Sequence, residues 1–161
     1  MHTIEVNGVR RQVDTDGDTP PLLYALRNHL GLKGTRFGCG QGLCGGACLV
    51  LIDGRPDYSC SVPMWAVDGR TITTIEGLGT PERPHPVARA FVAAQAAQCG
   101  YCISGMVVGA VGLLTDNDHP TEEQVRAGLD RNLCRCGAHN RTSARCWPRP
   151  KSSGGAAQAM E

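Results

Sequence analysis

The chain of 161 residues has few aromatic residues, almost no net charge and no long apolar run. Aromatic side chains make up 4% of it, so a core has to be built from Val, Leu, Ile and Ala or be stabilised by other means. Sixteen basic and fifteen acidic residues argue against a nucleic-acid binder and against electrostatic attachment to a membrane. No run of about 18 apolar residues is present, which argues against a membrane-spanning helix.

The residue present in excess is cysteine, with 9 copies. The first eleven residues lack the basic cluster and apolar run of a signal peptide, so we expect a cytoplasmic protein. Export together with a partner that carries a signal would instead place it in the periplasm. Thiols stay reduced in the cytoplasm, where many cysteines indicate metal ligands rather than disulfides.

The first half of the chain predicts a small α+β unit over residues 1–78. Alternating apolar residues around Asn7-Gly8 predict a hairpin over residues 3–13. Apolar periodicity predicts three further elements: a helix over residues 20–30 and strands over residues 48–52 and 71–75.

The second half predicts a helical unit over residues 87–141, joined to the first by a Pro-rich linker over residues 79–86. Apolar residues between Ile103 and Leu114 follow helical spacing, and Thr121 with Gln124 forms a capping box that begins another helix. Residues 142–161 contain two prolines and a Ser-Gly-Gly segment, so we expect an irregular tail.

Eight of the cysteines form two groups of four, and Cys146 in the tail is left over. The first group is Cys39, Cys44, Cys48 and Cys60, and the second is Cys99, Cys102, Cys134 and Cys136. Four thiolates can hold one zinc ion or one iron–sulfur cluster. The first spacing, C-x4-C-x3-C, is close to the plant-type [2Fe–2S] pattern, whereas the second spacing alone leaves zinc open.

The glycines of the first group have a physical role in this interpretation. Gly40, Gly42 and Gly45 allow the backbone to take positive φ angles and to wrap around an inorganic core. The same loop can direct amide N–H groups at sulfur, which stabilises the negative charge added on reduction.

The segments FGCGQGLCG at residues 37–45 and Ala47-Cys48 resemble the first cluster motif of the xanthine dehydrogenase (molybdenum hydroxylase) family. QCGYC at residues 98–102 and NLCRCG at residues 132–137 resemble its second motif. The match is to the stand-alone iron–sulfur subunits of that family. One departure is that three residues, not two, separate Cys44 from Cys48.

The resemblance implies a β-grasp ferredoxin-like domain followed by a four-helix domain, each with one [2Fe–2S] cluster. It implies that the chain has no catalytic residues of its own and relays electrons from a large subunit. That subunit would carry molybdopterin, with the cytosine dinucleotide form expected, and Gln98 and Cys136 would lie near the pterin. The sequence leaves the electron acceptor open between a flavin subunit, a cytochrome c subunit and a ferredoxin. The alternatives are a free ferredoxin-like carrier and a zinc-stabilised interaction module.

Overall fold

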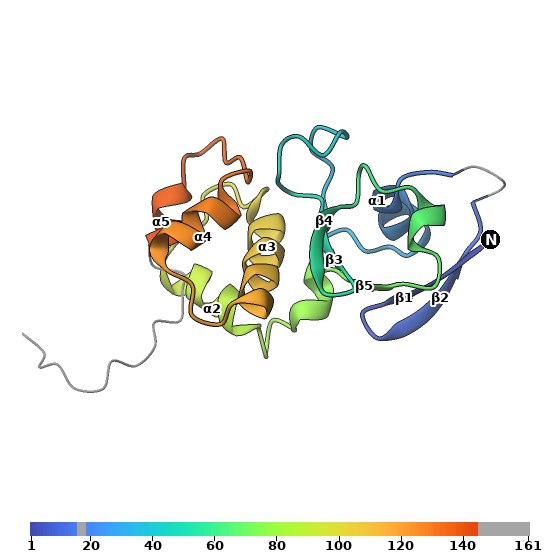
Figure 1. The fold of residues 1–161 in the computed structure, drawn as a ribbon, viewed down its shortest axis with the longest axis horizontal. Coiled ribbons are helices and arrows are strands. Elements are labelled where there is room, and N and C mark those ends of the chain that lie inside the picture. Colours follow the sequence, from blue (N-terminus) through green and yellow to red (C-terminus); the bar gives the residue numbers. More distant parts are fainter. Residues whose placement is uncertain (16–18, 145–161) are drawn as a thin grey trace, which may run out of the picture.

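The computed structural model describes residues 1–15 and 19–144 and divides into a sheet-containing half and a helical half (Figure 1). The sheet half contains β1 (His2–Val6), β2 (Val9–Val13), β3 (Leu49–Ile52), β4 (Arg55–Tyr58) and β5 (Thr71–Thr73). The strand order is β2-β1-β5-β3-β4, with β1 and β5 parallel and the other neighbours antiparallel. The α+β class is therefore confirmed.

Short helical segments connect the strands. The helix predicted over residues 20–30 is α1 (Leu22–Tyr24), which continues as the wider η1 (Ala25–His29). The short helices η2 (Met64–Val67) and η3 (Ile75–Leu78) flank β5. The strand predicted over residues 71–75 was too long, because at Thr74 the amide N–H donates to Asn7 Oδ1 and the chain turns into η3.

Four helices form the other half: α2 (Pro86–Ala93), α3 (Ile103–Asp116), α4 (Glu122–Leu129) and α5 (His139–Ala144). The capping box of Thr121 and Gln124 is present at the start of α4. Pro86, the last residue of the segment predicted as a linker, is the first residue of α2, and α5 extends to Ala144. Cys146 and the rest of the predicted tail lie outside the described residues.

The two halves share strand β3. Val50 and Ile52 belong to the core that contains α1 and η1, whereas Leu49 and Leu51 belong to the core that contains α2 and α3. Successive side chains of a strand point to opposite faces, so one continuous apolar strand serves both cores. The helical half is therefore packed on the sheet, as Figure 1 shows for α3 and β3. None of the described helices has the length and apolar character that crossing a bilayer requires.

Candidate metal centres

The first cysteine group lies in the loop before β3 and in the turn after β4. Cys39 is exposed and Cys44 half-buried in the loop that leads to β3, whereas Cys48 and Cys60 are buried at the ends of the β3–β4 hairpin. The Sγ atoms of Cys48 and Cys60 lie 3.4 Å apart. The Cys44 thiol is close enough to Cys39 to lower the pKa of Cys39. The four thiols therefore approach one another as two pairs.

Backbone N–H groups of the glycine-rich loop point at the sulfur atoms. Three of them donate to Cys39 Sγ, from Gln41 at 3.4 Å and from Leu43 and Cys44 at 3.3 Å each. These bonds, led by that of Gln41, lower the pKa of Cys39 to about 6. The Gly42 N–H donates to Cys60 Sγ at 3.2 Å. The loop is thus built to stabilise negative charge on sulfur.

The buried thiol of Cys48 has the opposite tendency. Burial raises the pKa of Cys48 to about 12, and its neighbour Cys60 adds to the effect. A thiolate in this position needs a compensating positive charge, which a bound iron would supply. The three loop glycines predicted from the sequence, Gly40, Gly42 and Gly45, all have positive φ angles.

The second cysteine group lies at the ends of helices. Cys99 and Cys102 are in the connection between α2 and α3, and Cys134 and Cys136 are in the connection between α4 and α5. A hydrogen bond from the Tyr101 N–H, followed by the Cys136 thiol, lowers the pKa of Cys99. Burial, followed by the Cys134 thiol, raises the pKa of Cys102 to about 12. This group therefore also consists of two pairs, Cys99 with Cys136 and Cys102 with Cys134.

Each group contains the types of donor that a two-iron cluster takes. A [2Fe–2S] cluster takes four cysteine thiolates, two on each iron, and amide hydrogen bonds to its sulfurs tune its potential. The paired thiols and the N–H donors supply these elements. Among residues 1–15 and 19–144, no three His, Cys, Asp or Glu side chains meet closely enough to hold a single metal ion. The donor set thus fits one [2Fe–2S] cluster in each group.

Gly45 and Gly46, which lie between Cys44 and Cys48, contact the helical half. A Cβ added at Gly45 would lie 1.8 Å from the carbonyl oxygen of Arg131, so only glycine allows this contact. The next residue, Gly46, meets α3, where a Cβ at Gly105 would lie 1.8 Å from the Gly46 oxygen. The two glycines therefore form the part of the first loop that packs on the helical half.

Two residues that belong to the second cluster motif, Gly105 and Asn132, have a role at this junction that sequence reasoning did not find. Gly105 is the first of three glycines in α3 that contact the sheet half. Their spacing is visible in the sequence, but the apolar residues between them drew the interpretation toward a buried helix face. The side chain of Asn132 is buried and its Nδ2 donates to the Gly45 carbonyl. Asn132 lies in the quoted NLCRCG segment, but its partner is 87 residues away in the chain.

The predicted pterin neighbours lie together on the surface of the helical half. Gln98 is exposed, and its Nε2 donates to the Cys136 carbonyl at 3.1 Å. This bond ties the segment before Cys99 to the Cys134–Cys136 loop. The role of Gln98 and Cys136 toward a pterin stays a prediction.

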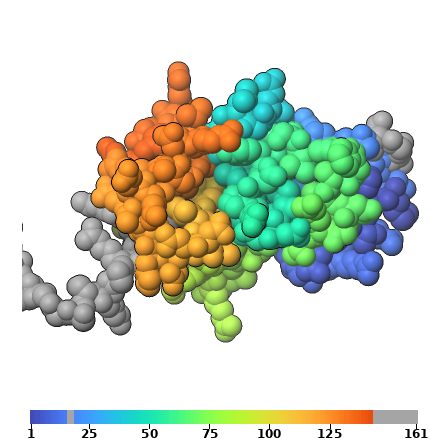
Figure 2. Space-filling view, in the orientation of Figure 1, coloured from blue at the N-terminus to red at the C-terminus, as the bar shows by residue number. Residues whose placement is uncertain are grey.

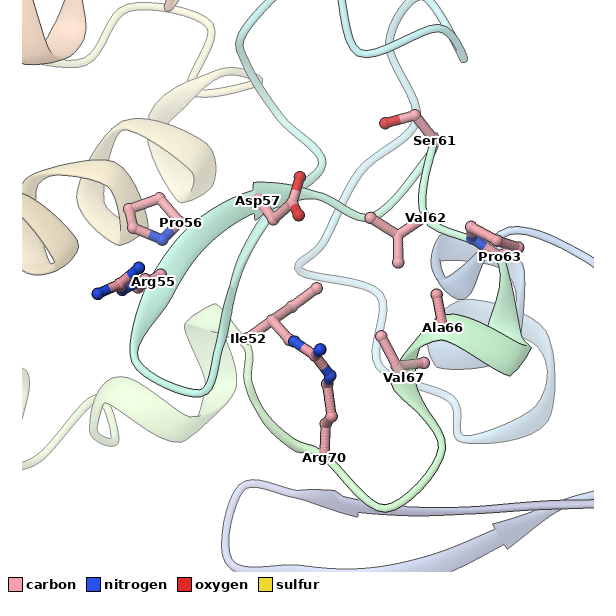
Figure 3. A pocket seen from close by; sticks show the side chains of 10 residues that line it. All are labelled: Ile52, Arg55, Pro56, Asp57, Ser61, Val62, Pro63, Ala66, Val67 and Arg70. Carbon is pink, nitrogen blue, oxygen red and sulfur yellow. The ribbon is translucent and has the colours of Figure 1, made fainter.

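A cavity of about 370 Å³ lies elsewhere, beside β4 (Figure 3). Its lining includes Arg55, Asp57 and Arg70 with several apolar side chains, and none of the eight cysteines. Arg70 pairs with Asp53 at 3.4 Å, so this arginine already has an acidic partner. The Ser61 hydroxyl in the lining donates to the Tyr58 carbonyl at 3.0 Å.

Comparison with known proteins assigns the two halves. A 2Fe-2S iron-sulfur cluster binding domain matches residues 4–72, and a [2Fe-2S] binding domain matches residues 74–145. The chain is 51% identical to one of the nicotinate dehydrogenase subunits of Pseudomonas putida over 137 residues, which cover 85% of this chain and 86% of that one. It is 46% identical to the alpha subunit of isoquinoline 1-oxidoreductase from Brevundimonas diminuta, with 84% and 88% covered.

The chain belongs to the xanthine dehydrogenase (molybdenum hydroxylase) family, as one of its small iron–sulfur subunits. Solved structures agree. Quinoline 2-oxidoreductase from Pseudomonas putida 86 superposes with a TM-score of 0.79 at 34% identity, covering 90% of this chain and 91% of that one. Aldehyde oxidoreductase from Desulfovibrio gigas gives a TM-score of 0.83 at 43% identity, but the match is 16% of that longer chain.

Family membership decides between the alternatives left open by the sequence. The chain is the electron-transfer subunit of an oxidoreductase, binds two [2Fe–2S] clusters and works with a large molybdopterin-containing subunit. The expectations of a β-grasp ferredoxin-like half and a helical cluster-binding half are confirmed.

Proposed function

We propose that Cys39, Cys44, Cys48 and Cys60 hold one cluster and that Cys99, Cys102, Cys134 and Cys136 hold the other. The observation that carries this assignment is the close pairing of thiols within each group. The clusters supply one-electron redox chemistry when bound. The chain supplies the ligands, the N–H donors that stabilise a reduced state, and the spacing between the two centres.

We propose further that residues 87–141 face the large subunit, whereas residues 1–78 face the electron acceptor, with residues 79–86 as the connection. The exposed Gln98, bonded to the half-buried Cys136, supports this direction, because the two place a polar side chain and a proposed ligand residue at the surface of the helical half. The acceptor is a flavin or cytochrome c subunit. The cytosine dinucleotide form of the pterin belongs to the same proposal.

The substrate of the complex is, on this proposal, a nitrogen-containing aromatic ring. The supporting relatives are named for nicotinate, isoquinoline and quinoline. On the same proposal, the complex is located in the cytoplasm, or in the periplasm if a partner directs export. A purified complex that reduces a dye with nicotinate or quinoline but not with aromatic aldehydes would support the substrate class, and the reverse preference would refute it.

The cluster assignment is tested by metal analysis of the complex purified without oxygen through a tag on this chain. About four iron and four sulfide per chain, with molybdenum in a larger co-purifying chain, are expected. Zinc without sulfide would contradict the assignment, and a holo chain that elutes alone would favour a free carrier.

Two matched serine variants sharpen the test. Cys48→Ser removes one proposed ligand of the first group and should leave about two iron per chain, both in the second cluster. Cys146→Ser changes the cysteine that belongs to neither group and should keep about four iron per chain. Equal iron in the two variants would remove Cys48 from the ligand set.

A further inference from the structure

The connection between Cys99 and Cys102 is held by an arginine from the sheet half. Arg36 Nη1 donates to the carbonyl oxygens of Gly100 at 2.7 Å and of Tyr101 at 3.2 Å. The guanidinium also lies over the Tyr101 ring, 5.4 Å from its centroid. In return, the Tyr101 hydroxyl donates to the Phe37 carbonyl at 2.7 Å. Arg36 and Phe37 directly precede the first cysteine loop, in which Cys39 is the first thiol.

The loop between Cys39 and Cys44 is held in turn by an arginine from the helical half. Arg131 Nη2 donates to the Gly42 carbonyl at 3.1 Å. Its guanidinium lies over the Tyr58 ring, 4.9 Å from the centroid. Tyr58 stands two residues before Cys60, so both contacts of Arg131 fall within the first cysteine group.

The two sets of contacts are reciprocal. Arg36 lies three residues before Cys39 and reaches into the second group, whereas Arg131 lies three residues before Cys134 and reaches into the first. Each guanidinium donates to backbone carbonyls of the opposite loop and stacks on a tyrosine beside its cysteines. We call this pair, Arg36 and Arg131, the arginine clasp. In Figures 1 and 2 the two loops, cyan for the first and orange for the segment after Arg131, lie at one edge of the molecule.

A backbone hydrogen bond lies between the two arms of the clasp. The Leu133 N–H donates to the Cys44 carbonyl at 3.2 Å. Leu133 precedes Cys134 in the chain, so this bond joins a proposed ligand of one cluster to the neighbour of a proposed ligand of the other. This bond and the contacts of the clasp therefore join the same two cysteine groups.

We propose that Arg36 and Arg131 are positioning residues for electron transfer between the two clusters. The inference rests on the proposed cysteine assignment. The step is a one-electron exchange: one ferrous iron in the helical half is oxidised and one ferric iron in the sheet half is reduced, with no bond or proton change. A fixed spacing is what this step needs from the protein, because electron exchange between two separated centres becomes slower as the distance between them grows.

Arginine suits this task better than lysine does. Its planar group donates several parallel hydrogen bonds and stacks on an aromatic ring, whereas a lysine ammonium is a compact point charge. Arg36→Lys therefore keeps the charge but loses the planar group that lies over the Tyr101 ring. Tyr101→Phe keeps the ring and removes only the hydroxyl bond to Phe37.

The experiment uses the tagged chain with its co-purifying partners and compares five proteins: the unsubstituted complex, Arg36→Met, Arg36→Lys, Tyr101→Phe and Arg126→Ala. Arg126 is the matched control because its guanidinium pairs with Glu122 of its own helix rather than with a cysteine loop. Each preparation is assayed for iron and sulfide, for the magnetic interaction between the reduced clusters by electron paramagnetic resonance, and for the rate of electron transfer between the clusters after a single reduction.

With iron unchanged, we expect Arg36→Met to weaken the magnetic interaction and to slow the transfer relative to the unsubstituted complex. Arg36→Lys and Tyr101→Phe should have smaller effects in the same direction, and Arg126→Ala none. If the clasp serves stability alone, Arg36→Met would lower the melting temperature and leave the magnetic interaction and the transfer rate unchanged. That result would overturn the proposal. If Arg36→Met fails to keep its iron, Tyr101→Phe decides: an unaltered magnetic interaction and rate in that variant would overturn it. Fewer than four iron in the unsubstituted complex would contradict the cluster assignment instead.

Discussion

Replacing Gly45 with alanine tests how closely the first cysteine loop packs on the helical half. Gly45 has a φ of +55°, and an added Cβ would lie 1.8 Å from the Arg131 carbonyl oxygen. Since Cβ atoms essentially never come within 3.0 Å of another heavy atom, the two backbones have to separate by more than about 1 Å. A backbone carbonyl cannot rotate away as a flexible side chain can, so the junction itself must open.

The cost has two parts. Alanine in the left-handed conformation costs about 1–2 kcal/mol. Opening the junction also breaks the hydrogen bonds from Leu133 N–H to the Cys44 carbonyl and from Asn132 to the Gly45 carbonyl, each with a net value of about 1 kcal/mol. We therefore expect a loss of about 3–4 kcal/mol, which in a chain of this size lowers the melting temperature by roughly 6–16 °C.

Gly8→Ala separates the two parts. Gly8 also has a positive φ, of +77°, but an added Cβ would have nothing within 4 Å. Gly8→Ala should lose only the conformational part, about 1–2 kcal/mol of the free energy of unfolding, which lowers the melting temperature by roughly 2–8 °C. Circular dichroism melts of the iron-loaded chain, with iron measured before each scan, compare the two variants. If Gly45→Ala melts no lower than Gly8→Ala, the reasoning about the junction is refuted.

Three further predictions concern the helical half. Gly105→Ala should have a much lower melting temperature than Gly109→Ala, because a Cβ at Gly105 would lie 1.8 Å from the Gly46 oxygen. The nearest atom to a Cβ at Gly109 is 3.5 Å away, and alanine favours a helix more than glycine does. Equal melting temperatures would contradict this packing. Thr121→Ala removes a helix cap and should cost about 1 kcal/mol while leaving iron unchanged, and a loss of iron would show that α4 is coupled to the clusters. Burial lowers the pKa of His85, whose Nδ1 accepts from the Val87 N–H, so its stabilising contribution is complete above about pH 6.5 and is lost as pH falls through the folded pKa. His85→Asn keeps a capping oxygen that does not titrate. The melting temperature of this variant should therefore fall less than that of the unsubstituted chain between about pH 7.5 and pH 5.5. An equal fall in the two proteins would refute the pH-dependent contribution of His85.

Local features of the sequence predicted the elements well. The hairpin at Asn7-Gly8 and the capping box at Thr121 depend on residues only a few positions apart, so their chemistry is visible in a short window. The apolar run at residues 48–52 correctly predicted a buried strand. The spacing of the cysteines likewise separated the eight thiols into the two groups that the structure brings together.

The contacts between the two halves could not be predicted in this way. Arg36 and Gly100 are 64 residues apart, and Arg131 and Gly42 are 89 apart. Before the fold is known, both arginines are indistinguishable from solvated surface charges. The Pro-rich segment at residues 79–86 suggested separable modules, but the alternation of side chains along β3 places one strand in both cores.

Gly45 was correctly predicted as a loop glycine, but only one of its two structural requirements was visible in the sequence. The sequence assigned it to the loop because glycine permits a positive φ, and the structure has one there. The same conformation could be supplied by a loop that faces solvent, as at Gly8 and Gly54. At Gly45 the missing side chain is needed as well, because it leaves room for the Arg131 carbonyl and so sets how near the second cysteine group can come. A glycine that wraps one cluster therefore also sets the approach of the segment that leads to the other.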